Sequence, residues 1–425
     1  MKRITCIFLL LLLLLYPSNN AFCEETTEIK NIDDLNLGSV SFYDSDEIYY
    51  QSPTDEIDLP LQNSDQLKST IITPFLDTKI EKDKNYIFCS TFQMAWNEAC
   101  KMLDEPIAIN SIQSFVHKLN ILINQPNLLT DDSYIAMAGF KKDNIIEKIN
   151  QALKNKFKNP PVVNAKLSND YDILAYSYLN KKLLFKHKFE NIKDGLLFSF
   201  GTIEVIVSAF GINNYSSLKH ENSAKQIELL YWNDEIDNLP KGCIVNLKTL
   251  SQNDELIISS LPIEDTLIKT YGKIKDFINH KYENYLTPDQ LISLTKIKCS
   301  HSQNDSIIFS SFIVPKINFD ILHSYDILKN KILDNRKLLI KLNLIDQFYF
   351  ISEAIQYIKF KLNEDGAKLE SYAKIVLSIG KGFIIKTPLS INGPFIVYLK
   401  NKNSDYPYFM TYIGNNELLI NKEVK

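Results

Sequence analysis

The amino-acid sequence predicts an α+β fold in which helices pack around large antiparallel β-sheets. Apolar residues recur at helical spacing between Cys89 and Phe157, whereas short apolar runs with strand character follow one another from Tyr171 onward. The chain contains no internal repeat and no low-complexity block. Helices followed by many strands, without regular alternation, are typical of an α+β fold rather than of a parallel α/β sheet.

The amino terminus has the pattern of a secretory signal peptide. Lys2-Arg3 precede an apolar run from Ile4 to Tyr16, and small or polar residues follow up to Cys23. The apolar run is too short for a comfortable membrane span. We therefore expect a signal peptide over residues 1–23 and a secreted protein, periplasmic or extracellular. A lipid anchor on Cys23 is the alternative, and only then is a membrane an expected partner.

An acidic segment follows the signal peptide. Between Glu24 and Pro60 the chain holds eleven Asp or Glu and one Lys, without apolar periodicity, so we expect residues 24–63 to be an extended leader. Residues 64–425 are expected to form a single domain. The apolar content of 45% is ordinary for a globular protein, and the net charge of −4 does not point to nucleic acid. We expect a monomer.

Three helices are predicted in the first part of this domain, because apolar residues recur there every three or four positions. They span Cys89–Leu103, Ser111–Ile123 and Asn144–Phe157. In the first of them Phe92, Trp96 and Met102 share one face.

Most of the remaining chain is predicted to form strands. The predicted strands are Leu183–Phe189, Thr202–Phe210, Gln226–Trp232, Gly242–Leu250, Glu255–Leu261, Ser306–Phe319, Phe348–Leu362, Pro394–Lys400 and Tyr408–Ile413. In the first of them Phe185, His187 and Phe189 are expected on one face. Further helices are predicted at Ile268–His280, at Thr287-Pro288-Asp289-Gln290 with proline in the first turn, and at Ser324–Leu333.

No catalytic or metal-binding motif stands out. The chain has no HExxH, GxSxG or phosphate-binding glycine loop, so we expect no metal, no cofactor and no enzymatic activity. Cys299 and His301 would share a face of a strand, and an unrelated secreted enzyme using them is the remaining alternative. Trp96 and Trp232 are expected in the core.

The cysteines of the mature chain fit no metal spacing. They are Cys89, Cys100, Cys243 and Cys299. Four buried thiols and one or two disulfides are both compatible with the sequence, which does not assign pairs.

The last third of the chain carries the most specific motifs. Tyr349 to Ile355 leads into Phe360-Lys361-Leu362, and Asn363-Glu364-Asp365-Gly366 follows as a turn signal. Gly393-Pro394-Phe395 begins a later apolar run, and Tyr408 to Asn415 lies near the end of the chain. In this order the motifs resemble the carboxyl-terminal part of serpins: the strand and hinge before the reactive-centre loop, the strand after the loop, and the closing strand.

Weaker similarities extend the resemblance to serpins over about Lys84 to Asn415. They are Asn85–Ser90, Ala175–Leu179 with Phe185 and Phe189, Ile313–Phe319 and Ser324–Leu328. The resemblance implies a serpin-like fold with an exposed reactive-centre loop over about residues 367–391.

In serpins this loop is a bait for a protease, and the cleaved loop inserts as a new strand into the main sheet. The resemblance therefore implies a protease inhibitor that acts by suicide cleavage and insertion of the loop after Gly366. The implied partner is a serine protease or, alternatively, a cysteine protease. The catalytic residues then belong to the target.

The resemblance places the hinge of the loop at Glu364, Gly366, Ala367, Leu369, Ser371 and Ala373. Alternation sends Ala367, Leu369, Ser371 and Ala373 to one face of an inserted strand. Inhibitory serpins carry small residues in this hinge, and Leu369 departs from that pattern. Tyr372 is bulky on the opposite face.

Other departures concern the residues around the loop. Gln356 stands where serpins usually carry a histidine that helps to latch the sheet, and Asn392-Gly393 replaces the usual histidine before Pro394. The loop is also somewhat longer than in typical inhibitors. These departures favour the alternative of a non-inhibitory serpin-fold protein that binds a partner or acts as a surface interaction module.

The candidate scissile region is Ile379, Gly380, Lys381 and Gly382, by counting from the hinge. A lysine at the cleaved position suits a trypsin-like protease. The alternative is that Lys381 is only a solvated loop charge.

Overall fold

The computed structural model describes residues 60–121, 129, 132–213, 221–233, 240–279, 309–368 and 387–422. They lie in a compact unit that begins at Asp58. The predicted signal peptide and all but the last residues of the predicted leader lie outside the described residues, as do the predicted helix start at Thr287-Pro288 and the pair Cys299 and His301.

In the described residues the main sheet has five strands in the order β1-β13-β14-β15-β6, and among these strands only the β1–β13 pair is parallel. The strands are β1 Gln62–Asn63, β13 Ile317–Ser324, β14 Ile355–Asn363, β15 Gly366–Lys368 and β6 Leu183–Leu184. Along β14, Ile358 and Phe360 are buried whereas Ile355 and Tyr357 are exposed. This alternation turns one face of the sheet to the core.

A second sheet has seven strands within the described part of the chain, in the order β2-β3-β18-β17-β11-β10-β9. They are β2 Thr70–Thr73, β3 Asn85–Cys89, β18 Phe409–Ile413, β17 Phe395–Asn401, β11 Asp254–Ser259, β10 Gly242–Leu247 and β9 Ile227–Asn233. Every residue of β3 and β18 is buried. Both faces are covered, since one face packs in the main core and the other packs against helix α5, Leu267–Ile278.

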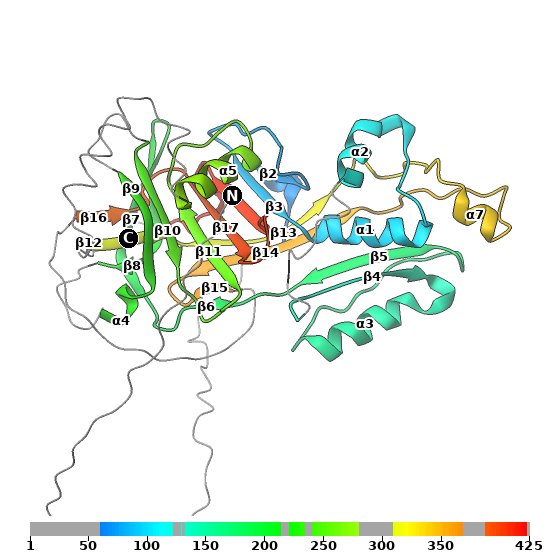
Figure 1. The fold of residues 1–425 in the computed structure, drawn as a ribbon, viewed down its shortest axis with the longest axis horizontal. Coiled ribbons are helices and arrows are strands. Elements are labelled where there is room, and N and C mark those ends of the chain that lie inside the picture. Colours follow the sequence, from blue (N-terminus) through cyan, green and yellow to red (C-terminus); the bar gives the residue numbers. More distant parts are fainter. Residues whose placement is uncertain are drawn as a thin grey trace, which may run out of the picture. The chain divides into compact units, whose positions relative to one another are not determined.

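Two smaller sheets contain the other described strands. One has the order β16-β12-β8-β7, and the other pairs β4 with β5. Their strands are β16 Thr387–Ser390, β12 Phe309–Pro315, β8 Ile203–Ile212, β7 Glu190–Phe200, β4 Tyr134–Phe140 and β5 Ile173–Leu179. The β4–β5 pair lies beside helices α1 and α3 (Figure 1).

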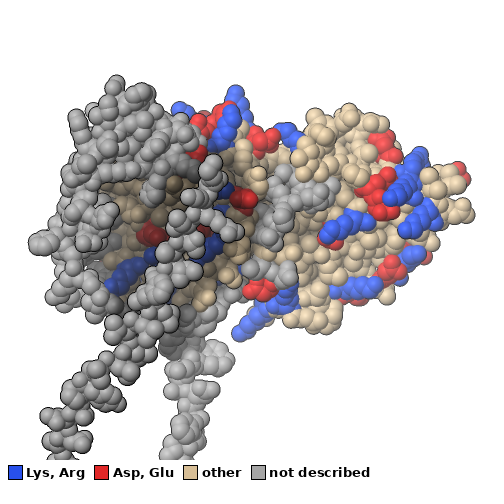
Figure 2. Space-filling model, in the orientation of Figure 1, with Lys and Arg blue, Asp and Glu red and all other residues tan. Residues whose placement is uncertain are grey.

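The remaining helices are short or amphipathic. They are α1 Thr91–Leu103, α2 Gln113–Ile121, α3 Ile145–Lys156, α4 Glu221–Ala224 and α7 Lys337–Lys341, with 3₁₀ turns at Ser64–Gln66, Asn110–Ile112, Lys141–Asp143 and Asn416–Leu418. Phe92, Trp96, Cys100 and Leu103 form the buried face of α1. Figure 2 shows Lys and Arg side chains interspersed with Asp and Glu side chains in the region of α1, α3 and α7.

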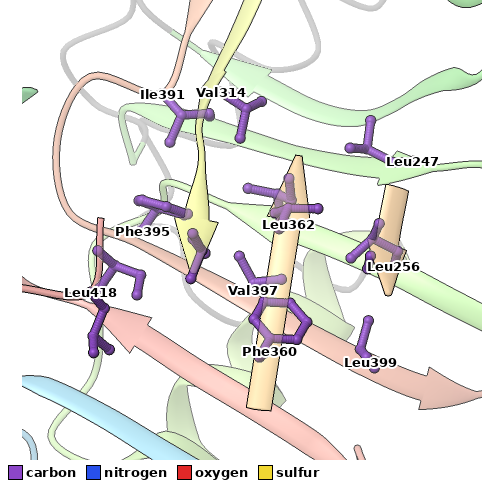
Figure 3. Packing of buried hydrophobic residues seen from close by; sticks show 14 of the residues in the cluster. Leu247, Leu256, Val314, Phe360, Leu362, Ile391, Phe395, Val397, Leu399 and Leu418 are labelled. Atoms are coloured by element: carbon purple, nitrogen blue, oxygen red, sulfur yellow. The ribbon is translucent and has the colours of Figure 1, made fainter. Parts of the chain in front are cut away.

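The main core lies where the sheets meet. In Figure 3, Phe360 and Leu362 of β14 lie near Val397 and Leu399 of β17, and all four side chains are buried. Phe360 also packs on Phe409 of β18, with ring centroids 4.5 Å apart. The core therefore ties the main sheet to the seven-stranded sheet directly beneath β14.

The predicted α+β fold is confirmed, and most predicted elements match observed ones within a few residues. The three early helices correspond to α1, α2 and α3, and the helix at Ile268–His280 corresponds to α5. Trp96 is buried as expected, whereas Trp232 is only half-buried and packs against the main core. Cys89, Cys100 and Cys243 are buried free thiols.

The helix predicted at Ser324–Leu333 is wrong. Strand β13 continues to Ser324, and a turn follows in which Asn330 has a φ of 59°. The N–H groups of Asn330 and Leu333 donate to the carbonyls of Ile351 and Tyr349, at 2.7 and 2.9 Å. These tertiary hydrogen bonds take the place of the helical ones.

Two predicted strands are also divided. Only Leu183–Leu184 of Leu183–Phe189 is a strand. Phe185 and Phe189 are buried, whereas His187 is only half-buried, and its N–H donates to Gln226 Oε1 at 2.7 Å. The predicted strand Ser306–Phe319 changes sheet at Lys316, whose N–H donates to the Ser208 carbonyl at 2.8 Å.

Two properties concern the described part of the chain. None of its helices is long and apolar enough to cross a membrane. No three His, Cys, Asp or Glu side chains gather there as a metal site would require.

Candidate functional site

The turn at the end of β14 depends on the side chain of Asn363 and on a glycine at position 366. Asn363 Oδ1 accepts a hydrogen bond from the Asp365 N–H at 3.1 Å, which closes the turn. Gly366 has a φ of 132°, and a Cβ at this position would lie 2.3 Å from the Leu183 carbonyl oxygen. Only glycine fits both the conformation and the space.

Strand β15 lies between β14 and β6. Ala367 is paired with Leu362 on one side and with Leu183 on the other, and it is fully buried. Thus the first residues after the turn already occupy a strand position in the main sheet.

Two backbone hydrogen bonds and one buried ion pair anchor this turn. The N–H groups of Phe185 and Phe189 donate to the carbonyls of Asp365 and Glu364, each at 2.9 Å. The Glu364 carboxylate lies 2.6 Å from Lys316 Nζ, and both side chains are at least nine-tenths buried. Lys188 adds a more exposed contact with Asp365, at 3.0 Å.

Replacing Glu364 by Gln is expected to lower the free energy of unfolding by about 3 kcal/mol, because the buried Lys316 ammonium loses its carboxylate. Urea denaturation of the mature protein measures the change. The matched control is Asp365→Asn, which removes a carboxylate at the exposed contact with Lys188 and should cost less than about 1 kcal/mol. Equal effects of the two variants would contradict the assigned role of the buried pair.

A second cluster joins β14 and β5 to the start of α1. Gln356 is buried, and its Nε2 donates to the Cys89 carbonyl at 3.0 Å and to Thr91 Oγ1 at 2.9 Å. Tyr325 Oη donates to Gln356 Oε1 at 2.7 Å. From β5, Ser177 Oγ donates to the Thr91 carbonyl at 2.5 Å. Both strands are therefore bonded to the same residue, Thr91.

Gln356, which stands where the resemblance leads us to expect a histidine, therefore bonds β14 to the start of α1. The amide supplies both a donor and an acceptor, so it can hold three partners without a histidine.

Between Thr91 and the turn, β14 and β5 do not pair with each other in the described residues. β15 pairs with β14 only as far as Lys361, and the described partner of β5 is β4. The space beside β14, from Lys361 down to Gln356, is the place where a continuation of β15 would run.

The structure describes part of the predicted site. Gly366 and Ala367 pair with β6, and the carbonyl of Glu364 accepts a hydrogen bond from the Phe189 N–H. The other hinge residues and the scissile region lie outside the described residues, namely Leu369, Ser371, Ala373, Ile379, Gly380, Lys381 and Gly382. Asn392, before Pro394, accepts at its carbonyl a hydrogen bond from the Ser199 N–H at 2.9 Å, so the turn between β16 and β17 contacts β7.

Sequence reasoning missed four residues of this site. They are Thr91, Ser177, Lys188 and Lys316. Lys316 belongs to a run that resembles serpins, Ile313–Phe319, but nothing in the run indicates that its side chain meets Glu364. Thr91 and Ser177 have no local signal, because their role depends on two distant strands.

The described thiols are poor candidates for a nucleophile. Burial raises the pKa of Cys89 and raises the pKa of Cys243 to about 11. A buried thiol with a raised pKa is protonated near neutral pH and therefore inert.

No protein-family model matches the chain, and no curated protein matches it. Solved structures to which it is similar include human thyroxine-binding globulin complexed with thyroxine, with 13% identity and a TM-score of 0.39 over 78% of this chain and 92% of that chain. Human glycosylated kallistatin has 12% identity and a TM-score of 0.38 over 78% and 92%. Serpin48 of the insect Tenebrio molitor has 13% identity and a TM-score of 0.32 over 78% and 92%.

Proposed function

We propose that this protein, whose fold is similar to that of serpins, is a secreted inhibitor of serine proteases that acts by cleavage and insertion of the loop after Gly366. The observation that supports the proposal most directly is β15, which begins a strand between β14 and β6 immediately after the Gly366 turn. A loop that continued along the same path would become a full strand of the main sheet.

The register of β15 indicates which residues the loop would meet along this path. Extending its pairing with β14 sets Leu369 opposite Phe360, Ser371 opposite Ile358 and Ala373 opposite Gln356. Phe360, Ile358 and Gln356 are buried. The three hinge residues would therefore face the core.

The neighbours of the inserted loop on the side of β6 and β5 follow in the same way. Extending the pairing of β15 with β6 along the chain brings Ala373 opposite Ser177. Ser177 and Gln356 are the residues that bond to Thr91, so Ala373 would enter between them. A small side chain suits this position.

Inhibition requires a covalent step in the target protease. The hydroxyl of its catalytic serine attacks the carbonyl carbon of the cleaved residue and gives its proton, through the catalytic base of the protease, to the amide nitrogen. The peptide bond then breaks, so that an ester remains and the new amino terminus leaves as an amine. Insertion of the freed strand then pairs backbone groups along β14 and β5, which stabilises the complex before water hydrolyses the ester. A target with a cysteine nucleophile would form a thioester in the same way.

The test is to mix the mature protein with a trypsin-like protease and to analyse the products by denaturing electrophoresis. We expect a complex that survives boiling in detergent, and Lys381→Ala should remove it. Lys374→Ala, in the same loop, is the matched control and should leave it. Cleavage of the loop without any covalent complex, by trypsin-like and other serine and cysteine proteases alike, would contradict inhibition.

A non-inhibitory binding protein is the second candidate. The register that places Leu369 against Phe360 favours it, because a large side chain at this point of entry slows insertion past a packed core. In that case the loop is cleaved without any gain in stability.

A further inference from the structure

The first described residues of the chain are attached to the free edge of the main sheet. Strand β1 pairs in parallel with β13, with Gln62 beside Ile321 and Asn63 beside Leu322. A 3₁₀ turn follows, η1 Ser64–Gln66, and a capping box stabilises its start. In this box Asn63 Oδ1 accepts a hydrogen bond from the Asp65 N–H, and Gln66 Oε1 accepts one from the Asn63 N–H. We name residues Gln62–Gln66 the amino-terminal clamp.

The clamp reaches the core face of β13 through one side chain. Ser64 is buried, and its Oγ lies 2.9 Å from His323 Nδ1. Burial lowers the pKa of His323, while Asp65 and Asp326 act in the opposite direction. The neutral ring is therefore the form that pairs with Ser64 near pH 7.

His323 in turn adjoins the cluster that holds β14. In the β13–β14 pair, His323 is directly opposite Gln356. Its ring also packs edge-on against Tyr325, with centroids 4.5 Å apart, and Tyr325 donates to Gln356. A continuous set of contacts thus runs from Ser64 through His323 to Gln356 and on to Thr91.

The other end of the segment is fixed to the seven-stranded sheet. The Glu417 carboxylate accepts hydrogen bonds from the N–H groups of Lys68 and Ser69, at 2.7 and 3.0 Å, and from Thr70 Oγ1 at 2.6 Å. Since Thr70 begins β2, the chain forms a short strap between that sheet and β13.

We infer that the amino-terminal clamp restrains the opening of the main sheet, so that contact between Ser64 and His323 regulates how readily a strand enters beside β14. The inference rests on the proposed function. Entry of a strand requires β14, with β13 behind it, to move relative to Thr91 and β5. The clamp ties the far edge of β13 and opposes this movement.

The first test measures the clamp without any protease. Ser64→Ala in the mature protein should increase amide hydrogen exchange over residues 317–324 and 355–363 by at least about threefold, because β13 and β14 open more often. The matched control is Leu61→Ala, which removes an exposed side chain next to the clamp and should leave this exchange unchanged. Unchanged exchange in Ser64→Ala overturns the inference.

The second test closes the clamp covalently. Asn63 and Leu322 are neighbours across the β1–β13 pair, at a spacing that a disulfide can bridge, so Asn63→Cys with Leu322→Cys allows a lock. After cleavage of the loop between Ile379 and Gly382, the gain in melting temperature should develop about tenfold more slowly in the oxidised variant. Reduction of the disulfide should restore the rate. Equal rates in the two forms contradict the inference.

The two tests separate the clamp from the proposed function. If cleavage of the loop gives no gain in stability in the unmodified protein, the proposed function fails, and so does a regulatory role in insertion. Increased exchange in Ser64→Ala would still support the physical link between the clamp and β14. If cleavage does stabilise the protein but neither variant changes exchange or rate, the clamp alone is overturned.

Discussion

Cleavage of the mature protein between Ile379 and Gly382 is expected to raise its melting temperature by roughly 10 °C or more. The freed segment would extend β15 along β14, and each new backbone hydrogen bond would contribute about 0.5–1.5 kcal/mol. It would also bury Ser371 and Ala373 on the core face of the sheet. Calorimetry or circular dichroism before and after limited proteolysis measures the change.

The control for this experiment blocks the strand without altering the cleavage site. Ser371→Pro removes a backbone donor in the middle of the expected strand, so the nicked variant should melt near the temperature of the uncut protein. An unchanged melting temperature in the nicked unmodified protein would show that the loop does not insert. The non-inhibitory binding function would then be preferred.

Replacing Gly366 by Ala is expected to lower the free energy of unfolding by on the order of 3 kcal/mol or more. The added Cβ would lie 2.3 Å from the Leu183 carbonyl oxygen, and the φ of 132° is strained for any residue with a side chain. Since the clash is with backbone, neither β15 nor β6 can relieve it while they remain paired. The variant should also lose the gain in stability on loop cleavage.

Gly201→Ala separates the two causes of this effect. Gly201 has a φ of 57°, but nothing lies within 4 Å of its added Cβ, so only the conformational cost of about 1 kcal/mol remains. Chemical denaturation of the three proteins measures the difference. A loss of stability in Gly366→Ala no larger than that in Gly201→Ala would contradict the packed position of β15.

The sequence predicted correctly those helices, strands and turns that depend on residues close together in the chain. The apolar face of α1, the alternation along β14 and the turn at Asn363-Glu364-Asp365-Gly366 are all present in the structure. Each follows from side-chain spacing or from the backbone freedom of a few neighbouring residues.

The predictions that failed concern places where distant chain segments compete with local preference. Residues 324–333 have a helical pattern, but the N–H groups of Asn330 and Leu333 bond to the carbonyls of Ile351 and Tyr349 instead. The segment from Leu183 to Phe189 alternates like a strand, yet two of its N–H groups, those of Phe185 and Phe189, donate hydrogen bonds to carbonyls of the turn after β14. Such partners cannot be read from a window of ten residues.

The sequence by itself determined the α+β class, the resemblance to serpins and the prediction that Glu364, Gly366 and Ala367 belong to a hinge. Only the tertiary structure decided what these residues meet. It brings Lys316 into an ion pair with Glu364, and it places Gln356 of β14 where its side chain forms a hydrogen bond with Thr91. It also brings Ser64 to His323, 259 residues apart in the chain. The physical reason is that propensity and periodicity act over neighbouring residues in the chain. Buried polar side chains instead pair with the donor, acceptor or charge that the packing of the sheets brings next to them.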